Sequence, residues 1–285
     1  MYKPIYIVGL AHGGLTLLCN MLRQHPDLFT CSGKNIAFGG DEAHNDLYSV
    51  FPKSLRNPGG KGGSCWRYGL NIENHRRNEE HFNLPHQIQY TQIIDKICHD
   101  EGLRFLDKSK SYIIKMRYVQ KLLDFTDTYF IHVIRSPYVM ALKPLKFRHW
   151  YHDHKKLSDE QLMQRGSKII SENYRVFKED APFIKNLLQI RFEDLLLDTE
   201  NVLRKISNFI EIDYIDEMMP REGDGKRDRK WYPIKKWMVN QYKNPDKKPY
   251  LHTPEREARI EAGECHKIIK DFNYPRLFDI DSLIY

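Results

Sequence analysis

The sequence has few cysteines and no long apolar run. Its five cysteines are widely separated, and no two form a C-x-x-C pair, so neither a disulfide framework nor a cysteine-based zinc site is indicated. No apolar run approaches the roughly 20 residues that cross a bilayer, so we expect no integral membrane segment. The chain opens on a strand-like run without a basic and apolar leader, which predicts a cytoplasmic protein.

The composition is that of an ordinary globular protein. The 285 residues are 41% hydrophobic and 29% charged, which suffices for a sizeable core. We see no internal repeat and no low-complexity tract, and we therefore expect a single domain over residues 1–285. The net charge of +7 is spread along the chain and favours anionic ligands in general.

Strand-like and helix-like segments alternate along the chain. Four short apolar runs are expected to be buried strands: Pro4–Val8, Leu103–Leu106, Tyr129–Ile134 and Leu187–Phe192. The helical patterns are Thr16–Gln24, His86–His99, Tyr112–Phe125, Asp159–Phe177, Thr199–Ile210 and Thr253–Phe272. The alternation predicts an α/β fold with a central, mostly parallel sheet flanked by helices. Ligands of such sheets bind at the C-terminal ends of the strands.

A glycine turn follows the first strand and leads into an amphipathic helix. Gly9 and Gly14 have the four-residue spacing of a nucleotide-triphosphate P-loop, and Thr16 stands at its Ser/Thr position. Leu15 stands where the P-loop has its essential Lys. Such a turn still directs N–H groups and a helix N-terminus at an anion. The pattern predicts an anion-binding turn without the lysine of phosphoryl transfer.

An arginine ends the third predicted strand. Arg135 is followed by Pro137, which starts a helix, so the guanidinium is expected at the same sheet edge as the glycine turn. Arg suits a phosphate because its planar fork makes paired, charge-assisted hydrogen bonds. The residue alone leaves open whether it binds an anion, caps the sheet or pairs with a carboxylate.

The two segments together resemble the sulfotransferase family, whose donor is 3'-phosphoadenosine-5'-phosphosulfate. Its first motif, G-x-x-R-S-G-T-T/S-L-L, is similar to Gly9–Leu18, and its second, F-I-h-v-x-R-d-P, to Phe130–Pro137. Further similarities follow in the order of the family: His25–Asp27, Leu106–Ser109, Arg191–Leu195 and Thr253–Tyr274.

The resemblance implies roles for the matched residues. The residues that would hold the 5'-phosphosulfate are Gly13, Gly14, Leu15 and Thr16. Those that would hold the 3'-phosphate are Arg135 and Lys143, with help from Arg229 or Lys230. His12 and Lys108 would face the bridging oxygen, where charge develops as the sulfuryl group leaves. The product would be adenosine-3',5'-bisphosphate.

The chain departs from the family pattern at several of these positions. His12 replaces Arg or Lys, Gly13 replaces Ser, and Leu15 replaces the first Thr. Lys143 replaces a Ser eight residues after Arg135, and its ammonium can grip the same phosphate. His12 is a cation only when protonated. Either the rate of sulfuryl transfer falls with rising pH, or Lys108 does more than His12 to stabilise the negative charge on the bridging oxygen.

The general base is the least defined part of the site. Many family members have a Glu just after a Lys in the loop that follows the first helix, whereas Asn35 follows Lys34 in this chain. Glu42 is our first choice for the base, and Asp41 and His44 come next. The alternative is that these are solvated loop charges, in which case the chain lacks a base.

Three functions are compatible with these features. The first is a sulfotransferase acting on an acceptor hydroxyl, of a glycan or a small molecule. The second is a nucleotide-binding protein of the same fold with little catalysis, and the third is a P-loop kinase. The missing Lys and the absence of a Walker-B acid after an apolar strand count against the kinase.

One aromatic, basic segment raises the alternatives of a metal ion and of a nucleic acid as ligands. His149–His154 contains three histidines, but no second cluster matches it, so we expect no metal. Phe147–Lys156 could stack on single-stranded nucleic acid. No nucleic-acid fold signature accompanies it, so we expect no nucleic-acid partner.

Overall fold

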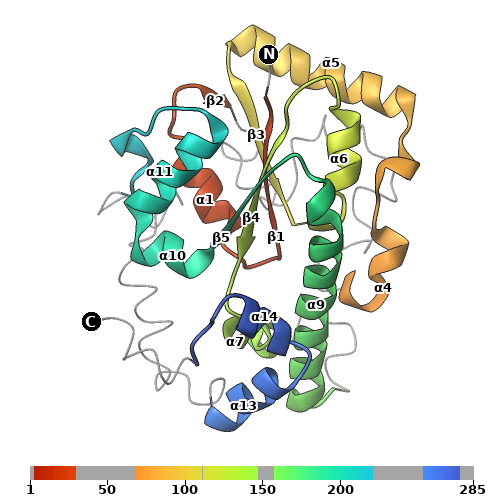
Figure 1. Ribbon diagram of the computed structural model, residues 1–285, viewed down its shortest axis with the longest axis vertical. Coiled ribbons are helices and arrows are strands. Elements are labelled where there is room, and N and C mark those ends of the chain that lie inside the picture. The colour runs from red at the N-terminus through yellow and green to blue at the C-terminus, as the bar shows by residue number, and fades with distance from the viewer. Residues whose placement is uncertain (1–2, 30–67, 111, 147–156, 221–252, 277–285) are drawn as a thin grey trace.

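The centre of the molecule is a parallel sheet. The computed structural model describes residues 3–29, 68–110, 112–146, 157–220 and 253–276. Within these residues five strands pair in the order β2-β3-β1-β4-β5, and every pair is parallel (Figure 1). The strands are β1 (Ile5–Gly9), β2 (Leu28–Phe29), β3 (Arg104–Ser109), β4 (Tyr129–Ile134) and β5 (Asn186–Arg191). This arrangement confirms the α/β fold expected from the sequence.

The two middle strands are buried along their whole length. Every residue of β1 and of β4 is buried, and Ile5 pairs with Leu106 on one side and with Tyr129 on the other. Their near-continuous apolar sequence follows from this burial, because helices cover both faces of the sheet.

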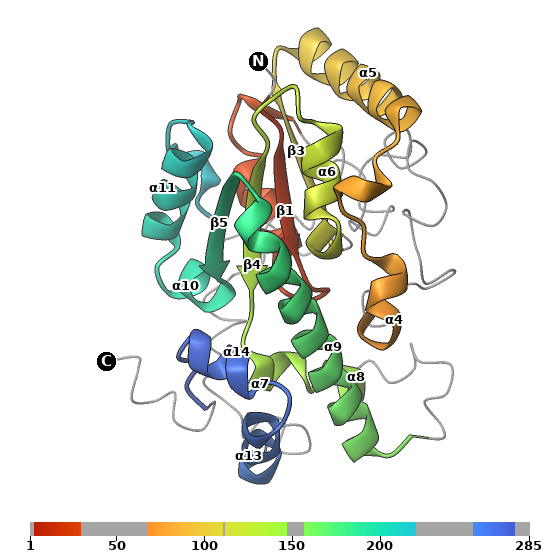
Figure 2. The same cartoon turned by 45° about the vertical axis from the view of Figure 1, so that its right-hand side comes forward.

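Helices form a layer on each face of the sheet. One layer contains α1 (Leu15–Leu22), α10 (Phe192–Leu197) and α11 (Thr199–Ile210). The other contains α6 (Met116–Leu122) and α9 (Asp159–Asp180), as Figure 2 shows. The long helix α5 (Leu84–Glu101) crosses the end at which the strands begin.

The opposite end, where the strands finish, carries the short helices that border the candidate site. They are α7 (Pro137–Met140), α8 (Lys143–Lys146), α13 (Pro254–Ala262) and α14 (His266–Asp271). Single 3-10 turns complete the described chain at Glu79–His81, Tyr112–Ile114, Ala181–Phe183 and Asp216–Met218. Thr253 caps α13 by accepting a hydrogen bond from the N–H of Arg256 at 3.3 Å, with Pro254 at the first helical position, as predicted.

Several segments differ from the sequence prediction, and the helices Tyr68–His75, Lys143–Lys146 and Phe192–Leu197 were not predicted. The predicted helix Tyr112–Phe125 is a 3-10 turn followed by α6, which ends at Leu122. The predicted closing helix is two helices, α13 and α14, because the chain leaves the helical conformation at Gly263. The two-residue strand β2 was not predicted, since a pattern of period two needs more residues to be recognised.

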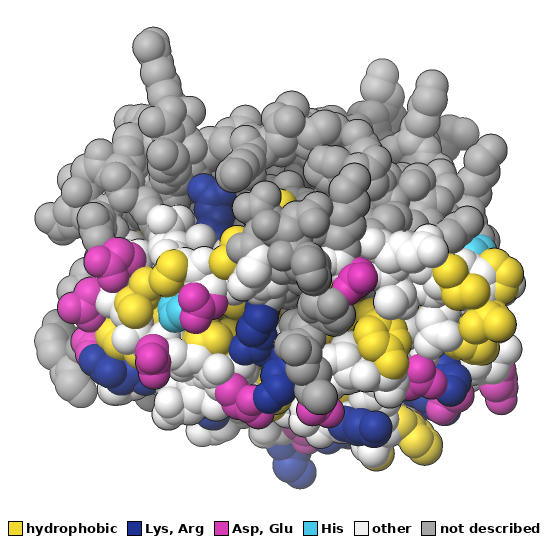
Figure 3. All heavy atoms as spheres, turned by 90° about the horizontal axis from the view of Figure 1, so that it is seen from above, with side chains coloured by type: hydrophobic (Ala, Val, Ile, Leu, Met, Phe, Trp, Pro, Cys, Tyr) yellow, Lys and Arg dark blue, Asp and Glu magenta, His cyan; other side chains and the backbone are white. Residues whose placement is uncertain are grey.

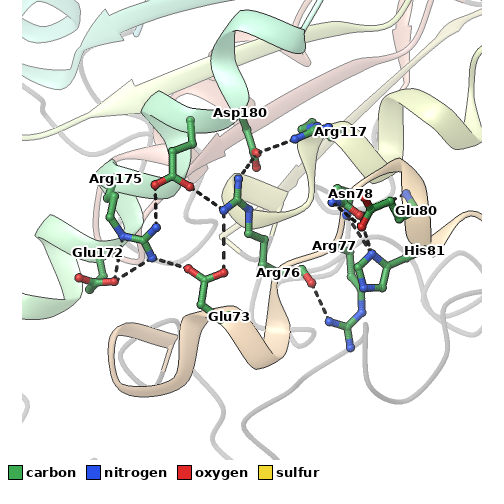
Figure 4. Close-up of polar contacts among 11 residues, drawn as sticks. Glu73, Arg76, Arg77, Asn78, Glu80, His81, Arg117, Glu172, Arg175 and Asp180 are labelled. Atoms are coloured by element: carbon green, nitrogen blue, oxygen red, sulfur yellow. Dashed lines mark hydrogen bonds and ion pairs between the residues drawn. The ribbon is translucent and has the colours of Figure 1, made fainter.

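Helix α4 (Tyr68–His75) is held on α9 by a network of charges (Figure 4). Arg76, directly after α4, donates to Asp180 at 2.5 Å and to Glu179 at 2.7 Å. Arg175 of α9 bonds both Glu179 and Glu73. Asp180 is fully buried, so its charge depends on Arg76 and on Arg117, whose Nη1 lies 3.7 Å away.

No helix in the described part of the chain is both long enough and apolar enough to cross a membrane.

Candidate functional site

Successive strands are added first on one side of β1 and then on the other, so the order of the strands reverses at β1. The chain passes from β1 to β2 and β3 on one side of the sheet, and β4 and β5 add to the other side. In open parallel sheets this reversal leaves a crevice at the C-terminal ends of the strands, where ligands bind. The turn after β1 and the residues after β4 flank this point, and they are the two segments that the sequence singles out.

Two glycines of the turn have no room for a side chain. Gly9 has a φ of +153°, and a Cβ there would lie 2.5 Å from the carbonyl oxygen of Val133. Gly14, the N-cap of α1, has a φ of +99°, and a Cβ there would overlap the ring of Phe192. The turn can therefore lie close against β4 and α10 only because these positions are glycine.

The turn ends in the N-terminus of α1. The N–H of Gly13 donates to the carbonyl oxygen of Leu10 at 3.0 Å, so it closes the turn on itself. The N–H of Leu18 makes the first bond of the helix, to Gly14 at 3.2 Å. The N–H groups of Leu15 and Thr16 precede it and have no helical acceptor. The Thr16 side chain is exposed and the Leu15 side chain is buried, so Leu15 offers only its backbone.

Arg135 lies directly against the turn. Its Nη1 donates to the carbonyl oxygen of His12 at 2.7 Å, and the guanidinium lies 4.5 Å from the centre of the Phe192 ring. His12 has a φ of +64°, in the left-handed region. The sequence predicts that His12 and Arg135 share a sheet edge, and the structure joins them by a hydrogen bond.

Two predicted lysines are buried in the surrounding structure. Lys143 begins α8 and is 8% exposed, and Lys108 lies in β3 beside Ile7 and is 2% exposed. An ammonium at such depth is strongly favoured near an anion, because the local dielectric is low.

Two further buried charged residues, Asp107 and Lys115, were not predicted from the sequence as part of the site. Asp107 accepts hydrogen bonds from the N–H of Lys108 at 2.7 Å and from the hydroxyl of Tyr112 at 2.9 Å. Lys115 is 2% exposed at the start of α6, and its ammonium, together with burial as the larger cause, lowers the pKa of His75. Lys115 stands between the apolar residues Ile114 and Met116, which is its only sequence signal, whereas Asp107 adjoins Lys108 and has no such signal.

A small cavity of about 20 Å³ lies under the turn, which is room for one water molecule. Gly13, Arg135, His132 and Asn173 are among the residues that line it. Burial lowers the pKa of His132 to about 3, and its ring stacks on Phe177 at 3.9 Å. His132 is therefore neutral at physiological pH and adds no charge beside the Arg135 guanidinium.

Several predicted site residues lie outside the described part of the chain. They are the base candidates Glu42, Asp41 and His44, the neighbouring Asn35, the basic pair Arg229 and Lys230, and the segment 147–156. Their roles stay predictions. Among the described residues, no group of three or more His, Cys, Asp and Glu side chains is arranged to hold a metal ion.

The end of the molecule that carries α5 has a mixed surface. Basic and acidic side chains are interspersed over the described part of this face, with apolar side chains between them (Figure 3). A duplex or single-stranded nucleic acid needs a continuous basic surface. The described part of this face offers no such surface.

The parallel sheet, with a tight glycine turn between its first strand and first helix, defines an α/β protein whose turn resembles that of a P-loop. The profile of the sulfotransferase family matches residues 4–216. The chain belongs to the sulfotransferase family.

Two similar solved structures have titles that name sulfotransferase domains. The chain is similar to the structure titled "Sulfotransferase Domain from the Curacin Biosynthetic Pathway", with a TM-score of 0.62 and 16% identity over 96% of this chain and 99% of that one. A sulfotransferase domain from the Synechococcus PCC 7002 olefin synthase is 18% identical over 95% of this chain and 94% of that one, with a TM-score of 0.48. No curated protein sequence matches the chain.

Proposed function

We propose that the protein transfers a sulfuryl group from 3'-phosphoadenosine-5'-phosphosulfate to an acceptor hydroxyl, of a glycan or a small molecule. The observation that carries the proposal is the hydrogen bond between Arg135 and the carbonyl of His12, 2.7 Å long. It brings a buried guanidinium to a glycine turn at the reversal point of the sheet. Membership of the sulfotransferase family supports the same reaction.

The turn fits the 5' end of such a donor. A Cβ on Gly13 would lie 2.8 Å from the carbonyl oxygen of Leu10, and one on Gly14 would overlap Phe192. Packing against Leu10 and Phe192 therefore requires glycine at both positions, and neither residue has a side chain that could cover the backbone N–H groups. The N–H groups of Gly14, Leu15 and Thr16 and the Thr16 hydroxyl would hold this group at the positive end of α1. The N–H of Gly13 is already bonded to Leu10, so it stabilises the turn.

Buried cations fit the 3'-phosphate. Nη1 of Arg135 donates to the carbonyl oxygen of His12, and the planar guanidinium is a group that suits a phosphate. Lys143, eight residues after Arg135 and the first residue of α8, would add an ammonium to the same phosphate. Arg229 or Lys230 would complete this half of the site. A salt contact of this kind is stronger in a buried setting than in water.

His12 and Lys108 would stabilise the charge on the departing bridging oxygen. The bound donor supplies the activated sulfuryl group, and the chain supplies position and electrostatics. Lys108 lies on β3, which neighbours β1, so sheet pairing fixes its distance from the turn. Glu42 is the proposed base that takes the proton from the acceptor hydroxyl.

A second function is favoured by two specific residues. His12 replaces a permanent cation of the family, and Asn35 replaces its frequent Glu. Both changes favour a nucleotide-binding protein with little catalysis. The kinase alternative has less support, because the Leu15 side chain that replaces the P-loop Lys is buried in the core.

Ligand-induced stabilisation separates these functions. Adenosine-3',5'-bisphosphate at 100 times its dissociation constant is expected to add about 2.7 kcal/mol to the free energy of unfolding. Stabilisation by ATP and not by the bisphosphate would overturn the proposal. Transfer from labelled donor to a panel of glycan, phenol and alcohol acceptors then distinguishes an active enzyme from a binding protein.

A further inference from the structure

The first residue of α10 lies between the two halves of the candidate donor site. Phe192 follows β5 directly and is 2% exposed. One part of its ring packs so closely on Gly14 that a Cβ at that glycine would overlap it. The Arg135 guanidinium lies over the same ring, 4.5 Å from its centre.

These contacts join the glycine turn, Phe192 and Arg135 in a ring of three contacts. Gly14 contacts Phe192, Phe192 contacts Arg135, and Arg135 donates to His12, two residues before Gly14. An aromatic ring has only two rotatable side-chain bonds and a fixed thickness, so it acts as a rigid spacer. A guanidinium over an aromatic face is also attracted to it by the ring quadrupole.

The next residue of α10 adds a second link. The Glu193 carboxylate accepts a hydrogen bond of 3.0 Å from the N–H of Ser136, directly after Arg135. The start of α10 is itself fixed, because Arg191 bonds Asp194 at 2.6 Å and the carbonyl oxygen of Phe272 at 3.0 Å. Phe192 is thus held by its own helix while it supports two other segments.

We infer that Phe192 is a positioning residue that sets the separation between the glycine turn and Arg135. It thereby determines how strongly the protein prefers a nucleotide with two phosphate groups over one with a single phosphate. This inference rests on the proposed function and deepens it. A ligand that bridges two contacts gains affinity from the second contact only when the spacing of the contacts matches its own.

The test measures a ratio of dissociation constants. Adenosine-3',5'-bisphosphate and adenosine-5'-monophosphate are titrated into the wild type, Phe192→Leu and Phe192→Met. We expect the preference for the bisphosphate to fall about tenfold in both variants, which corresponds to the loss of one well-placed cationic contact. The affinity for the monophosphate changes less than about threefold, because the turn alone binds it. Phe192→Tyr keeps the ring and is expected to keep the preference.

A matched control separates positioning from general packing. Phe105 is a fully buried aromatic residue on β3, where it packs against Tyr6. Phe105→Leu removes a similar amount of buried apolar surface, so its melting temperature should fall as that of Phe192→Leu does. Its preference for the bisphosphate should equal that of the wild type. Phe192→Met retains most of the volume and serves as the measured variant if the Leu variant fails to fold.

Two results would overturn the inference. One is an unchanged preference in Phe192→Leu or Phe192→Met, and the other is an equal loss in Phe105→Leu. Both leave the proposed function intact, since the wild type still binds the bisphosphate. A wild type that binds neither nucleotide overturns the proposed function and this inference with it.

Discussion

Nη1 of Arg135 donates to the carbonyl oxygen of His12 across 2.7 Å, although 123 residues separate the two in the chain. This bond ties the end of β4 to the turn after β1. Because His12 takes a left-handed backbone conformation, its carbonyl can turn toward Arg135 while the following residues enter α1. One side chain therefore supports the turn and offers charge at the crevice.

Arg135→Gln is expected to lower the affinity for adenosine-3',5'-bisphosphate by a factor of about 10 to 100. The variant removes a charge-assisted hydrogen bond, which contributes about 1.5–3 kcal/mol. Isothermal titration calorimetry measures the effect. Arg204→Gln, on the exposed face of α11 where Arg204 pairs with Glu200, is the control and should leave the affinity unchanged. Equal affinity in wild type and Arg135→Gln would contradict the assigned role.

Gly14→Ala is expected to abolish binding of the bisphosphate and to destabilise the fold by about 2–4 kcal/mol, because the new methyl group overlaps the ring of Phe192. Gly102→Ala is the matched control. Gly102 also has a positive φ, of +63°, but a Cβ there meets nothing within 4 Å. Its cost is therefore the backbone strain alone, about 1–2 kcal/mol. Urea unfolding compares the two, and equal losses would show that the overlap is absent.

His12→Arg restores the permanent cation of the family pattern. An imidazole neutralises the departing oxygen only when it is protonated, whereas a guanidinium is charged at every accessible pH. We expect turnover of the wild type to fall as the pH rises from 6 to 9 and turnover of the variant to stay level. Initial rates across this range measure the effect, with saturating donor and acceptor. A wild type and a variant with parallel pH profiles would exclude His12 from this role.

Stability is expected to fall in acid because of His132. Burial lowers its pKa from 6.5 to about 3, so the folded protein keeps the ring neutral while the unfolded chain takes up a proton below pH 6.5. The stabilisation is complete above pH 6.5 and is lost as the pH falls toward 3. At pH 5 the loss is about 2 kcal/mol, from 1.5 pH units at about 1.36 kcal/mol each.

The variant His132→Phe keeps the stack on Phe177 and cannot titrate. Its free energy of unfolding should change less between pH 7.5 and pH 5 than that of the wild type, by about the same 2 kcal/mol. Urea titrations at both pH values give the comparison. His266→Phe, at an exposed position on α14, should retain the wild-type dependence. If the free energy of unfolding of His132→Phe changes with pH as much as that of the wild type, a group other than His132 causes the loss of stability in acid.

Arg76→Met is expected to destabilise the protein by about 3 kcal/mol. The substitution leaves the buried Asp180 with Arg117, 3.7 Å away, as an ion-pair partner, and an under-compensated buried charge is costly. Burial already raises the pKa of Asp180, and loss of Arg76 raises it further. Arg204→Met breaks an exposed pair with Glu200 and a contact of the guanidinium with the Tyr214 ring at 4.0 Å, and it should cost less than about 1 kcal/mol. Equal effects in urea unfolding would show that the network contributes no more than a surface pair.

The predictable parts of the fold are those with a strong local pattern. The apolar runs at Pro4–Val8 and Tyr129–Ile134 identified β1 and β4 within one residue, and the capping residues identified the start of α13. Helix α4 was not predicted, because its position is fixed by charges on α9 rather than by an apolar stripe of its own. The break at Gly263 was missed, since a lone glycine is also tolerated inside helices.

The candidate site was predictable where a motif marks it. The glycine turn and Arg135 were found from their motifs, and their meeting at one edge followed from the parallel sheet. The contact of Phe192 with Gly14 was not found, because it joins residues 178 positions apart and depends on how α10 packs. No periodicity in the sequence encodes such a contact. Asp107 and Lys115 were missed for a similar reason, since burial of a charged side chain reflects tertiary packing.

The position of β1 has a consequence for synthesis of the chain. Among the strands of the sheet, the central β1 is synthesised before both of its partners, and Ile5 pairs with Leu106 and Tyr129. At about 5–20 residues per second, residues 10–134 take roughly 6–25 s to synthesise, and for that time β1 lacks one or both of its partner strands. During that time the segment is exposed as a site for aggregation or for a chaperone. Mutations that slow the docking of β4 should therefore reduce the yield of folded protein more than they reduce its equilibrium stability.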